Sequence, residues 1–287
     1  MSEEKIAYII RPMRRSDFPQ CQWLREQAGW NQTLVDWERF LSCNPGGCFV
    51  AEARDAVVGS VCTVAYPPAF GWVAMVLVDP GQRRQGIGKA LLRAGIEHLQ
   101  GRGLSVKLDA TPEGKMLYDT LGFVDEYQAW RMESGPIYPP EAHPDCTPVS
   151  LEDLDELDRF DQPIFGSSRR EVLASYLRAY PQYGFLIRRD GEIQGYILAR
   201  DGVHAFHIGP WVAYEAEDAV RLLHTMLHHH PAPRIFIDVL EPNPHVRVLL
   251  AEMGFRMQRS FIRMVLGPND HPGKPHLVYS LSGPELG

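Results

Sequence analysis

Residues 74–92 read AMVLVDPGQRRQGIGKALL, and this stretch decides the fold. Its first five residues are apolar, which predicts a buried strand. Pro80-Gly81 ends that strand, because proline donates no ladder hydrogen bond and glycine permits a sharp turn. Ile87, Leu91 and Leu92 then recur at helical spacing. The sequence therefore predicts a strand, a short glycine-rich turn and a helix in direct succession.

The turn between this strand and this helix is expected to bind an anion. Backbone N–H groups at the start of a helix have no intrahelical partners and lie at the positive end of the helix dipole. Gly86 and Gly88 have no Cβ atom to keep a ligand away. Arg83, Arg84 and Lys89 add positive charge. Phosphate is the usual occupant of such a site.

Bulk properties narrow the class of protein. A chain of 287 residues with 45% apolar residues suits two domains with sizeable cores. A net charge of −7 argues against nucleic acid as a general partner. No apolar run reaches membrane-spanning length, and Met1–Lys5 does not begin a secretory signal. The chain has five cysteines and no Cys-x-x-Cys pair, which argues against a zinc site and against a disulfide framework. A reducing, cytoplasmic location is therefore expected.

The first half alternates strands and helices. Periodicity, capping residues and Gly/Pro breaks predict strands at 6–12, 48–54, 57–66, 71–78, 104–110 and 123–132, and helices at 17–28, 33–40, 87–101 and 112–121.

Two motifs in this half resemble the GCN5-related N-acetyltransferase (GNAT) family. Arg83-x-x-Gly86-x-Gly88, after Val76-x-Val78-x-Pro80, is similar to the acetyl-coenzyme A signature of that family. Leu117-Tyr118, three residues before Gly122-Phe123, is similar to a second family stretch. The resemblance covers about residues 5–134. Family members often carry an Asn at the start of this second helix, where this chain has Thr111-Pro112-Glu113.

The resemblance implies an α/β fold with a twisted mixed sheet flanked by helices. Two parallel strands, here 71–78 and 104–110, would splay apart at the cofactor. The pantetheine arm would pair with Met75–Val78, and the pyrophosphate would lie on the amides of Arg84–Lys89. The residues assigned to acetyl-coenzyme A in this way are Val76, Leu77, Val78, Arg83, Arg84, Gln85, Gly86, Ile87, Gly88 and Lys89.

The implied reaction is transfer of an acyl group from a thioester to an amine that attacks directly in a ternary complex. A backbone N–H on the splayed strand would polarise the thioester carbonyl. Tyr118 would protonate the leaving thiolate as general acid. The base that deprotonates the amine is open: Glu52 and Asp109 are candidates, each of which could equally be a paired carboxylate, and water relays could serve instead.

The second half repeats the order of elements. Ser134–Pro144 is rich in proline and reads as a linker, which gives domains at 1–134 and 149–287 joined by 135–148. A hairpin at 185–200, strands at 205–212 and 234–239, and a helix at 216–228 follow. Met253-Gly254-Phe255 matches Leu121-Gly122-Phe123. The chain thus resembles two tandem GNAT-like domains.

The chemistry of the first half is not repeated in the second. Its loop 213–218 reads AYEAED, so that Glu215, Glu217 and Asp218 stand where phosphates would bind. Leu250 occupies the position that matches Tyr118. We therefore expect a degenerate, non-catalytic second domain.

A metal site is not expected either, although four histidines invite one. They are His224, His228, His229 and His230. The pair one turn apart could chelate zinc, but no third ligand is evident, which favours a solvated helix end.

The leading hypothesis is an acetyl-coenzyme A-dependent N-acetyltransferase that acts on a small-molecule amine. The first alternative is a regulatory or scaffold protein that binds coenzyme A without turnover. The second alternative is a transferase that acts on an amine of another protein. Tyr118 distinguishes the enzyme from the non-catalytic protein, because a protein that only binds coenzyme A needs no general acid at this position. The identity of the acceptor amine is open. The oligomeric state is open as well, and a homodimer is among the alternatives.

Overall fold

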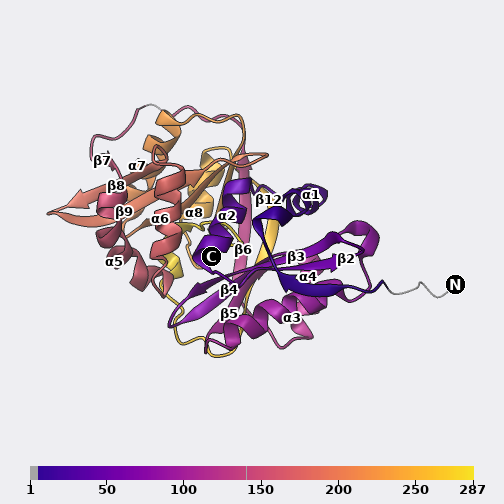
Figure 1. Ribbon diagram of the computed structural model, residues 1–287. Coiled ribbons are helices and arrows are strands. Elements are labelled where there is room, and N and C mark those ends of the chain that lie inside the picture. The colour runs from indigo at the N-terminus through magenta and orange to yellow at the C-terminus, as the bar shows by residue number, and fades with distance from the viewer. Residues whose placement is uncertain (1–5, 140) are drawn as a thin grey trace. The chain divides into compact units, whose positions relative to one another are not determined.

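The computed structural model describes residues 6–139 and 141–287. The chain divides into two compact units, Met1–Leu108 and Asp109–Gly287. Each unit contains β-strands flanked by helices (Figure 1). The predicted α/β fold class is therefore confirmed.

In the first unit the strands lie in the order β1-β2-β3-β4-β5. The first four pair antiparallel with their neighbours, and β5 pairs parallel with β4. The elements are β1 (Ile9–Pro12), α1 (Phe18–Gln27), α2 (Leu34–Cys43), β2 (Phe49–Ala53), β3 (Ala56–Tyr66), β4 (Phe70–Val78), α3 (Ile87–Gln100) and β5 (Ser105–Ala110), with short 3-10 helices at Arg15–Asp17 and Pro80–Gln82.

Helix α3 packs closely on the sheet of the first unit (Figure 1). Its apolar face is buried: the predicted residues Ile87, Leu91 and Leu92 lie on it together with Ile96 and Leu99. Gly71 on β4 allows this approach, since a Cβ there would lie 2.4 Å from a methyl carbon of Leu99. Burial of a leucine side chain contributes about 1.5–3 kcal/mol. The start of α3, and with it the turn that precedes it, is thus fixed by the core.

In the second unit the strands lie in the order β12-β6-β11-β10-β9-β8-β7, and β13 pairs with β10. The elements are α4 (Pro112–Asp119), β6 (Val124–Ser134), β7 (Cys146–Pro148), α5 (Leu154–Phe165), α6 (Arg170–Ala179), β8 (Gly184–Arg189), β9 (Glu192–Arg200), β10 (Phe206–Ala213), α7 (Ala216–His229), β11 (Ile235–Leu240), α8 (Val246–Glu252), β12 (Arg256–Leu266) and β13 (Val278–Ser280), with 3-10 helices at Leu151–Asp153 and Pro275–Leu277.

Strand β6 lies between β12 and β11 in the strand order of the second unit. It pairs antiparallel with both, and its Arg131 forms a bidentate ion pair with Asp238 of β11, at 2.8 and 2.7 Å. The sequence placed this strand at the end of the first domain, whereas its described partners belong to the second unit. The compact units therefore divide at Leu108/Asp109, and the boundaries 1–134, 135–148 and 149–287 stay a prediction about the repeat in the sequence.

Candidate active site

Strands β4 and β5 separate where the resemblance to the GNAT family implied that they would. Their parallel pairing joins Phe70, Gly71 and Trp72 to Ser105, Val106 and Lys107, and no described pairing continues it. Residues 73–78 of β4 pair with β3 on their other side. Their β5-facing edge thus has backbone groups available for a ligand that carries amides.

A β-bulge distorts β4 at this point. Ser60 of β3 lies opposite Leu77, but Cys62 lies opposite Ala74, so β4 contains one extra residue. Met75, within the bulge, has a φ of +53°, which a side chain other than glycine rarely adopts. The buried Ser60 hydroxyl donates to the Met75 carbonyl at 2.9 Å and holds this conformation. The bulge changes the direction of the backbone at 75–78, and no local sequence pattern predicted it.

The turn after β4 is built by its own side chains and by glycine. Asp79 accepts a hydrogen bond from the Gly81 N–H at 2.8 Å and begins the 3-10 helix Pro80–Gln82. Arg84 and Gly86 follow with φ of +63° and +88°. A left-handed residue beside a right-handed one directs neighbouring backbone N–H groups toward one point.

Six consecutive backbone N–H groups in this turn have no acceptor among the described residues. They belong to Arg84, Gln85, Gly86, Ile87, Gly88 and Lys89. The next N–H, of Ala90, donates to Gly86 at 3.0 Å and starts the regular helix. These six groups, which we call the amide cradle, are arranged as helix N-termini that bind anions are, and the anion itself stays a prediction.

Space and charge at the amide cradle suit an anion. A Cβ on Gly86 would meet nothing nearer than the Tyr8 hydroxyl at 3.8 Å, and one on Gly88 would touch Val78 at an ordinary 3.4 Å. Packing within the protein therefore does not require glycine at 88, although the backbone angle requires it at 86. Three exposed cations surround the turn without an ion pair in the described part of the chain, namely Arg83, Arg84 and Lys89.

The Gln85 side chain, in contrast, is engaged within the protein. Its carbonyl oxygen accepts from the Ile6 N–H at 2.9 Å, and its amide nitrogen donates to Gln82 at 3.1 Å. Among the ten residues assigned to the cofactor, Gln85 can therefore contact a ligand through its backbone N–H, since its side chain already forms hydrogen bonds within the protein.

Tyr118 lies on α4 in the second unit, so its proximity to the amide cradle stays a prediction. Thr111 caps α4, and its side chain accepts a hydrogen bond from the Gly114 N–H at 3.3 Å. The Tyr118 ring lies over Gly114, where a Cβ would come within 2.9 Å of it, and packs edge-on against Phe123 at 5.9 Å. Burial raises the pKa of Tyr118 to about 12, which keeps its proton in place at neutral pH.

The two candidate bases both have cationic partners. Glu52 pairs with Arg11 at 2.6 Å. The Asp109 side chain is buried and forms a bidentate ion pair with Arg263 at 2.9 and 3.0 Å; burial raises the pKa of this carboxyl, while Arg263 opposes the rise. Both carboxylates are therefore paired, as the second interpretation expected. The base that deprotonates the amine stays open.

The second half has an acidic loop without a comparable set of cations. Asp218 is buried and pairs with Arg189 at 3.0 Å and with Arg221 at 3.3 Å. Glu217 pairs with Arg221 at 2.6 Å. The acids at the start of α7 thus pair with Arg189 and Arg221, and these ion pairs leave neither arginine free to bind a pyrophosphate.

Metal binding finds no support at the histidines. Across residues 6–139 and 141–287, no group of three or more metal-ligating side chains comes together. His229 stacks on Phe185 at 5.4 Å, and His230 packs edge-on against Tyr183 at 4.7 Å. Within the same ranges, no helix has both the length and the apolar character needed to cross a membrane.

Comparisons with known proteins show which family the chain is similar to. A model of the acetyltransferase (GNAT) family matches residues 12–123, and a model of an acetyltransferase (GNAT) domain matches residues 157–280. The chain is 26% identical over 259 residues to holothin acyltransferase of Pseudoalteromonas sp. (strain SANK 73390), covering 90% of this chain and 87% of that one. It is 36% identical over 111 residues to mycothiol acetyltransferase of Thermobispora bispora, covering 34% and 37%.

Solved structures with similar folds include two long matches. A candidate acetyltransferase from Pyrococcus horikoshii has a TM-score of 0.81 at 24% identity, covering 98% of this chain and 96% of that one. A tandem GNAT protein from the clavulanic acid biosynthesis pathway has a TM-score of 0.62 at 16% identity, covering 92% and 100%. At these identities the likeness concerns the fold.

Proposed function

The chain belongs to the GNAT family and is an acyltransferase, and from this premise we propose that it acetylates a primary amine of a small molecule with acetyl-coenzyme A as donor. The observation that carries the proposal is the amide cradle at the start of α3, next to the separated edge of β4. A coenzyme with a pyrophosphate and an amide-containing arm matches these two features.

The residues of the first half divide the work of binding. The N–H groups from Arg84 to Lys89 would hold the pyrophosphate, with exposed cations around them. The backbone of Val76, Leu77 and Val78 would pair with the pantetheine arm. Acetyl-coenzyme A supplies the acetyl group as a thioester. Rigid placement of the donor against the acceptor lowers the barrier, because it removes the entropy cost of bringing the two together.

Two groups would act on the reacting atoms. A backbone N–H in the distorted stretch 75–78 would donate to the thioester carbonyl as negative charge develops on it. The Tyr118 hydroxyl, protonated at neutral pH, would give its proton to the departing sulfur. The amine would attack directly, without an acyl-enzyme, and would lose its proton to a base or to water, from which the Tyr118 hydroxyl is restored.

The small-molecule acceptor is supported by the relative that covers most of the chain. That relative is a holothin acyltransferase, aligned over 90% of this chain. The non-catalytic alternative predicts binding of coenzyme A without thiol release. A library of small amines, assayed for thiol release from acetyl-coenzyme A, separates the two and identifies the acceptor class.

The cofactor site is tested by Gly86→Glu, with Gly103→Glu as matched control. Both glycines are exposed and have positive φ, +88° and +75°, so the strain of the substitution is similar. Only at Gly86 does the carboxylate enter the amide cradle. Isothermal titration calorimetry should show acetyl-coenzyme A binding for the wild type and Gly103→Glu and a loss of about 100-fold or more for Gly86→Glu. Equal affinities in all three proteins would disprove the site.

A further inference from the structure

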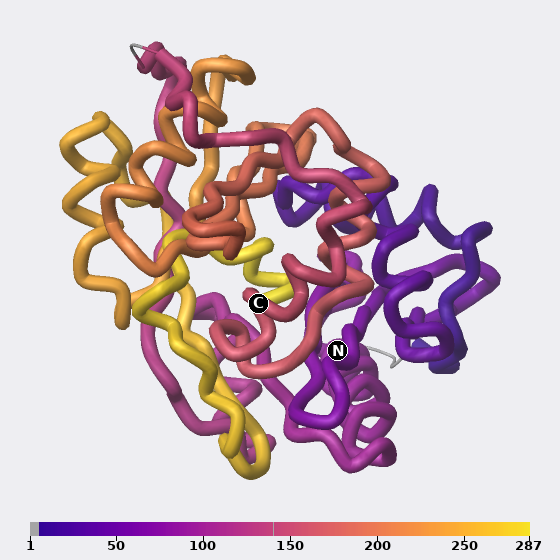
Figure 2. The backbone as a smooth tube through the Cα atoms, turned by 90° about the vertical axis from the view of Figure 1, so that its left-hand side faces the viewer, coloured from indigo at the N-terminus to yellow at the C-terminus, as the bar shows by residue number. Residues whose placement is uncertain are grey.

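The second unit contains a split between parallel strands like that of the first. Its β10–β11 pairing joins Phe206, His207 and Ile208 to Ile235, Phe236 and Ile237, and the described pairing ends there. Here, however, another strand continues the pairing. Strand β13 runs antiparallel to β10, with Trp211 opposite Ser280 and Val212 opposite Val278. Figure 2 shows the yellow C-terminal segment turned back among the strands of its own unit.

Ser280 bridges the two strands at the point where they separate. Its hydroxyl donates to the Ile208 carbonyl of β10 at 2.7 Å and accepts from the Asp238 N–H of β11 at 3.2 Å. The next residue, Leu281, donates its N–H to the Asp238 carbonyl at 2.9 Å. Both separated edges therefore use backbone groups to bind this segment.

The walls of the split are shaped to fit the segment. A Cβ on Gly209, where φ is +151°, would lie 1.8 Å from the Leu281 carbonyl oxygen, so the backbones approach as closely as glycine allows. Tyr279 is buried with its ring 5.0 Å from that of Trp211. Asn243, just before α8, donates to the Val278 carbonyl at 3.1 Å.

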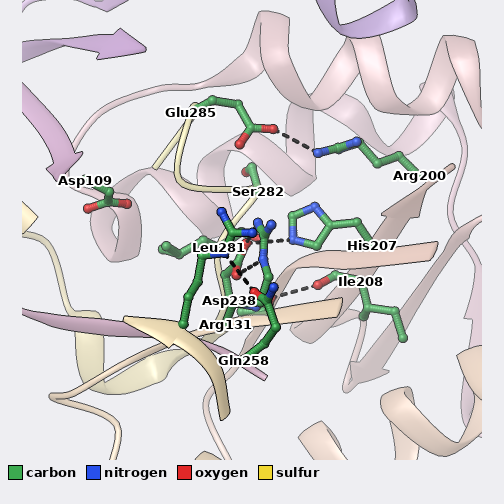
Figure 3. A network of polar contacts seen from close by, with 12 residues as sticks. Asp109, Arg131, Arg200, His207, Ile208, Asp238, Gln258, Leu281, Ser282 and Glu285 are labelled. Atoms are coloured by element: carbon green, nitrogen blue, oxygen red, sulfur yellow. Dashed lines mark hydrogen bonds and ion pairs between the residues drawn. The ribbon is translucent and has the colours of Figure 1, made fainter. Parts of the chain in front are cut away.

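Buried polar contacts hold the chain that follows β13. Glu285 pairs with Arg200 at 2.8 Å, with both side chains almost fully buried. Ser282 accepts from Arg169 at 2.9 Å, and its carbonyl accepts from the Tyr176 hydroxyl at 2.7 Å. Figure 3 shows Glu285 facing Arg200, next to Ser282 and Leu281.

We propose that the split between β10 and β11 is a peptide-binding site that holds the chain's own segment Val278–Glu285 where a cofactor arm would otherwise pair. The comparison with a cofactor arm rests on the function proposed for the first half. The acidic loop before α7 agrees with this assignment, because it cannot attract a pyrophosphate. Each chain then binds one coenzyme A, in its first half.

The test cuts the chain without removing the segment. A protease recognition sequence is inserted after the exposed Asp270 of the full-length protein, and the cleaved protein is passed through size exclusion with and without 1 mM coenzyme A. Mass spectrometry measures how much of the C-terminal peptide stays bound, and an isotope-labelled synthetic peptide measures its exchange rate. We expect retention in native buffer, with an exchange rate that coenzyme A does not change.

Two variants make the result specific. Ser280→Ala removes both hydrogen bonds that bridge the strands and should speed exchange about tenfold or more. His276→Ala changes an exposed side chain of the same peptide and should exchange like the wild type. Loss of the wild-type peptide on cleavage, an unchanged exchange rate in Ser280→Ala, or release driven by coenzyme A would each overturn the proposal. Failure of coenzyme A to bind the first half would refute the proposed function alone, because peptide retention does not depend on it.

Discussion

Tyr118 and Gly114 form a pair in which one residue positions the other. The tyrosine is a weaker acid than the thiol it would protonate, about pKa 12 against about 8.5, so its acidity contributes little. Placement of the hydroxyl must therefore matter more than its strength as an acid. The ring owes its place to the missing side chain at Gly114.

Two substitutions test this placement. Tyr118→Phe should lower kcat about 100-fold, because it removes the proton donor, and leave the affinity for acetyl-coenzyme A unchanged. Gly114→Ala should also lower kcat, since its Cβ would lie 2.9 Å from the ring, although alanine in a helix favours stability by about 1 kcal/mol. Steady-state kinetics and thermal unfolding give both readouts. Full activity in Tyr118→Phe would remove Tyr118 from the mechanism.

Among the strands and helices, β4 forms the candidate site because it pairs with β5 over only part of its length and is distorted by a bulge beyond that part. Its first residues are held on both sides by β3 and β5, whereas 73–78 keep β3 alone. The bulge depends on a cross-strand hydrogen bond from Ser60 to Met75. The geometry of the separated edge is therefore a property of two strands and not of the motif alone.

Loss of the Ser60 hydroxyl should relax the bulge. Ser60→Ala leaves the buried Met75 carbonyl without this donor, which should cost about 1–3 kcal/mol of unfolding free energy and lower kcat together with it. Ser42→Ala, an exposed position in α2, is the matched control and should change neither quantity. Urea unfolding and thiol-release kinetics measure both. Wild-type stability and activity in Ser60→Ala would show that the bulge does not need this bond.

At the scale of the whole chain, the sequence repeat and the compact units divide the protein at different places. The family models match 12–123 and 157–280, whereas the units meet at Leu108/Asp109. The difference lies in β6, which contributes a central strand and the partner of a buried carboxylate to the second unit. Removal of one member of a buried ion pair typically costs 3–5 kcal/mol.

Fragments should reveal which boundary governs folding. Residues 109–287 retain β6 and should unfold cooperatively, with a dispersed NMR spectrum. Residues 149–287, the second domain as the sequence defines it, expose the edges of β11 and β12 and leave Asp238 without Arg131. We expect this shorter fragment to aggregate or remain unfolded. Equal stability of the two fragments would contradict a structural role for β6.

Much of this architecture could be predicted from local patterns. The spacing of Ile87, Leu91 and Leu92 predicted the buried face of α3, and Arg83 to Gly88 predicted the turn before it. The sheet partner of β6 could not be predicted, because its alternating pattern suits any apolar neighbour. The positive φ of Met75 depends on a hydroxyl from another strand, and the position of β13 depends on backbone groups of β10 and β11. Such contacts leave no periodic signal.

The most direct test of the amide cradle is amide hydrogen exchange, resolved by residue, with and without coenzyme A. We expect slower exchange at Arg84–Lys89 and at Val76–Val78 when coenzyme A is bound, because these N–H groups gain acceptors. We expect no change at residues 213–218, the acidic loop of the second half. Unchanged exchange at Arg84–Lys89 under saturating coenzyme A, or protection at 213–218 instead, would contradict the assignment of the amide cradle to coenzyme A.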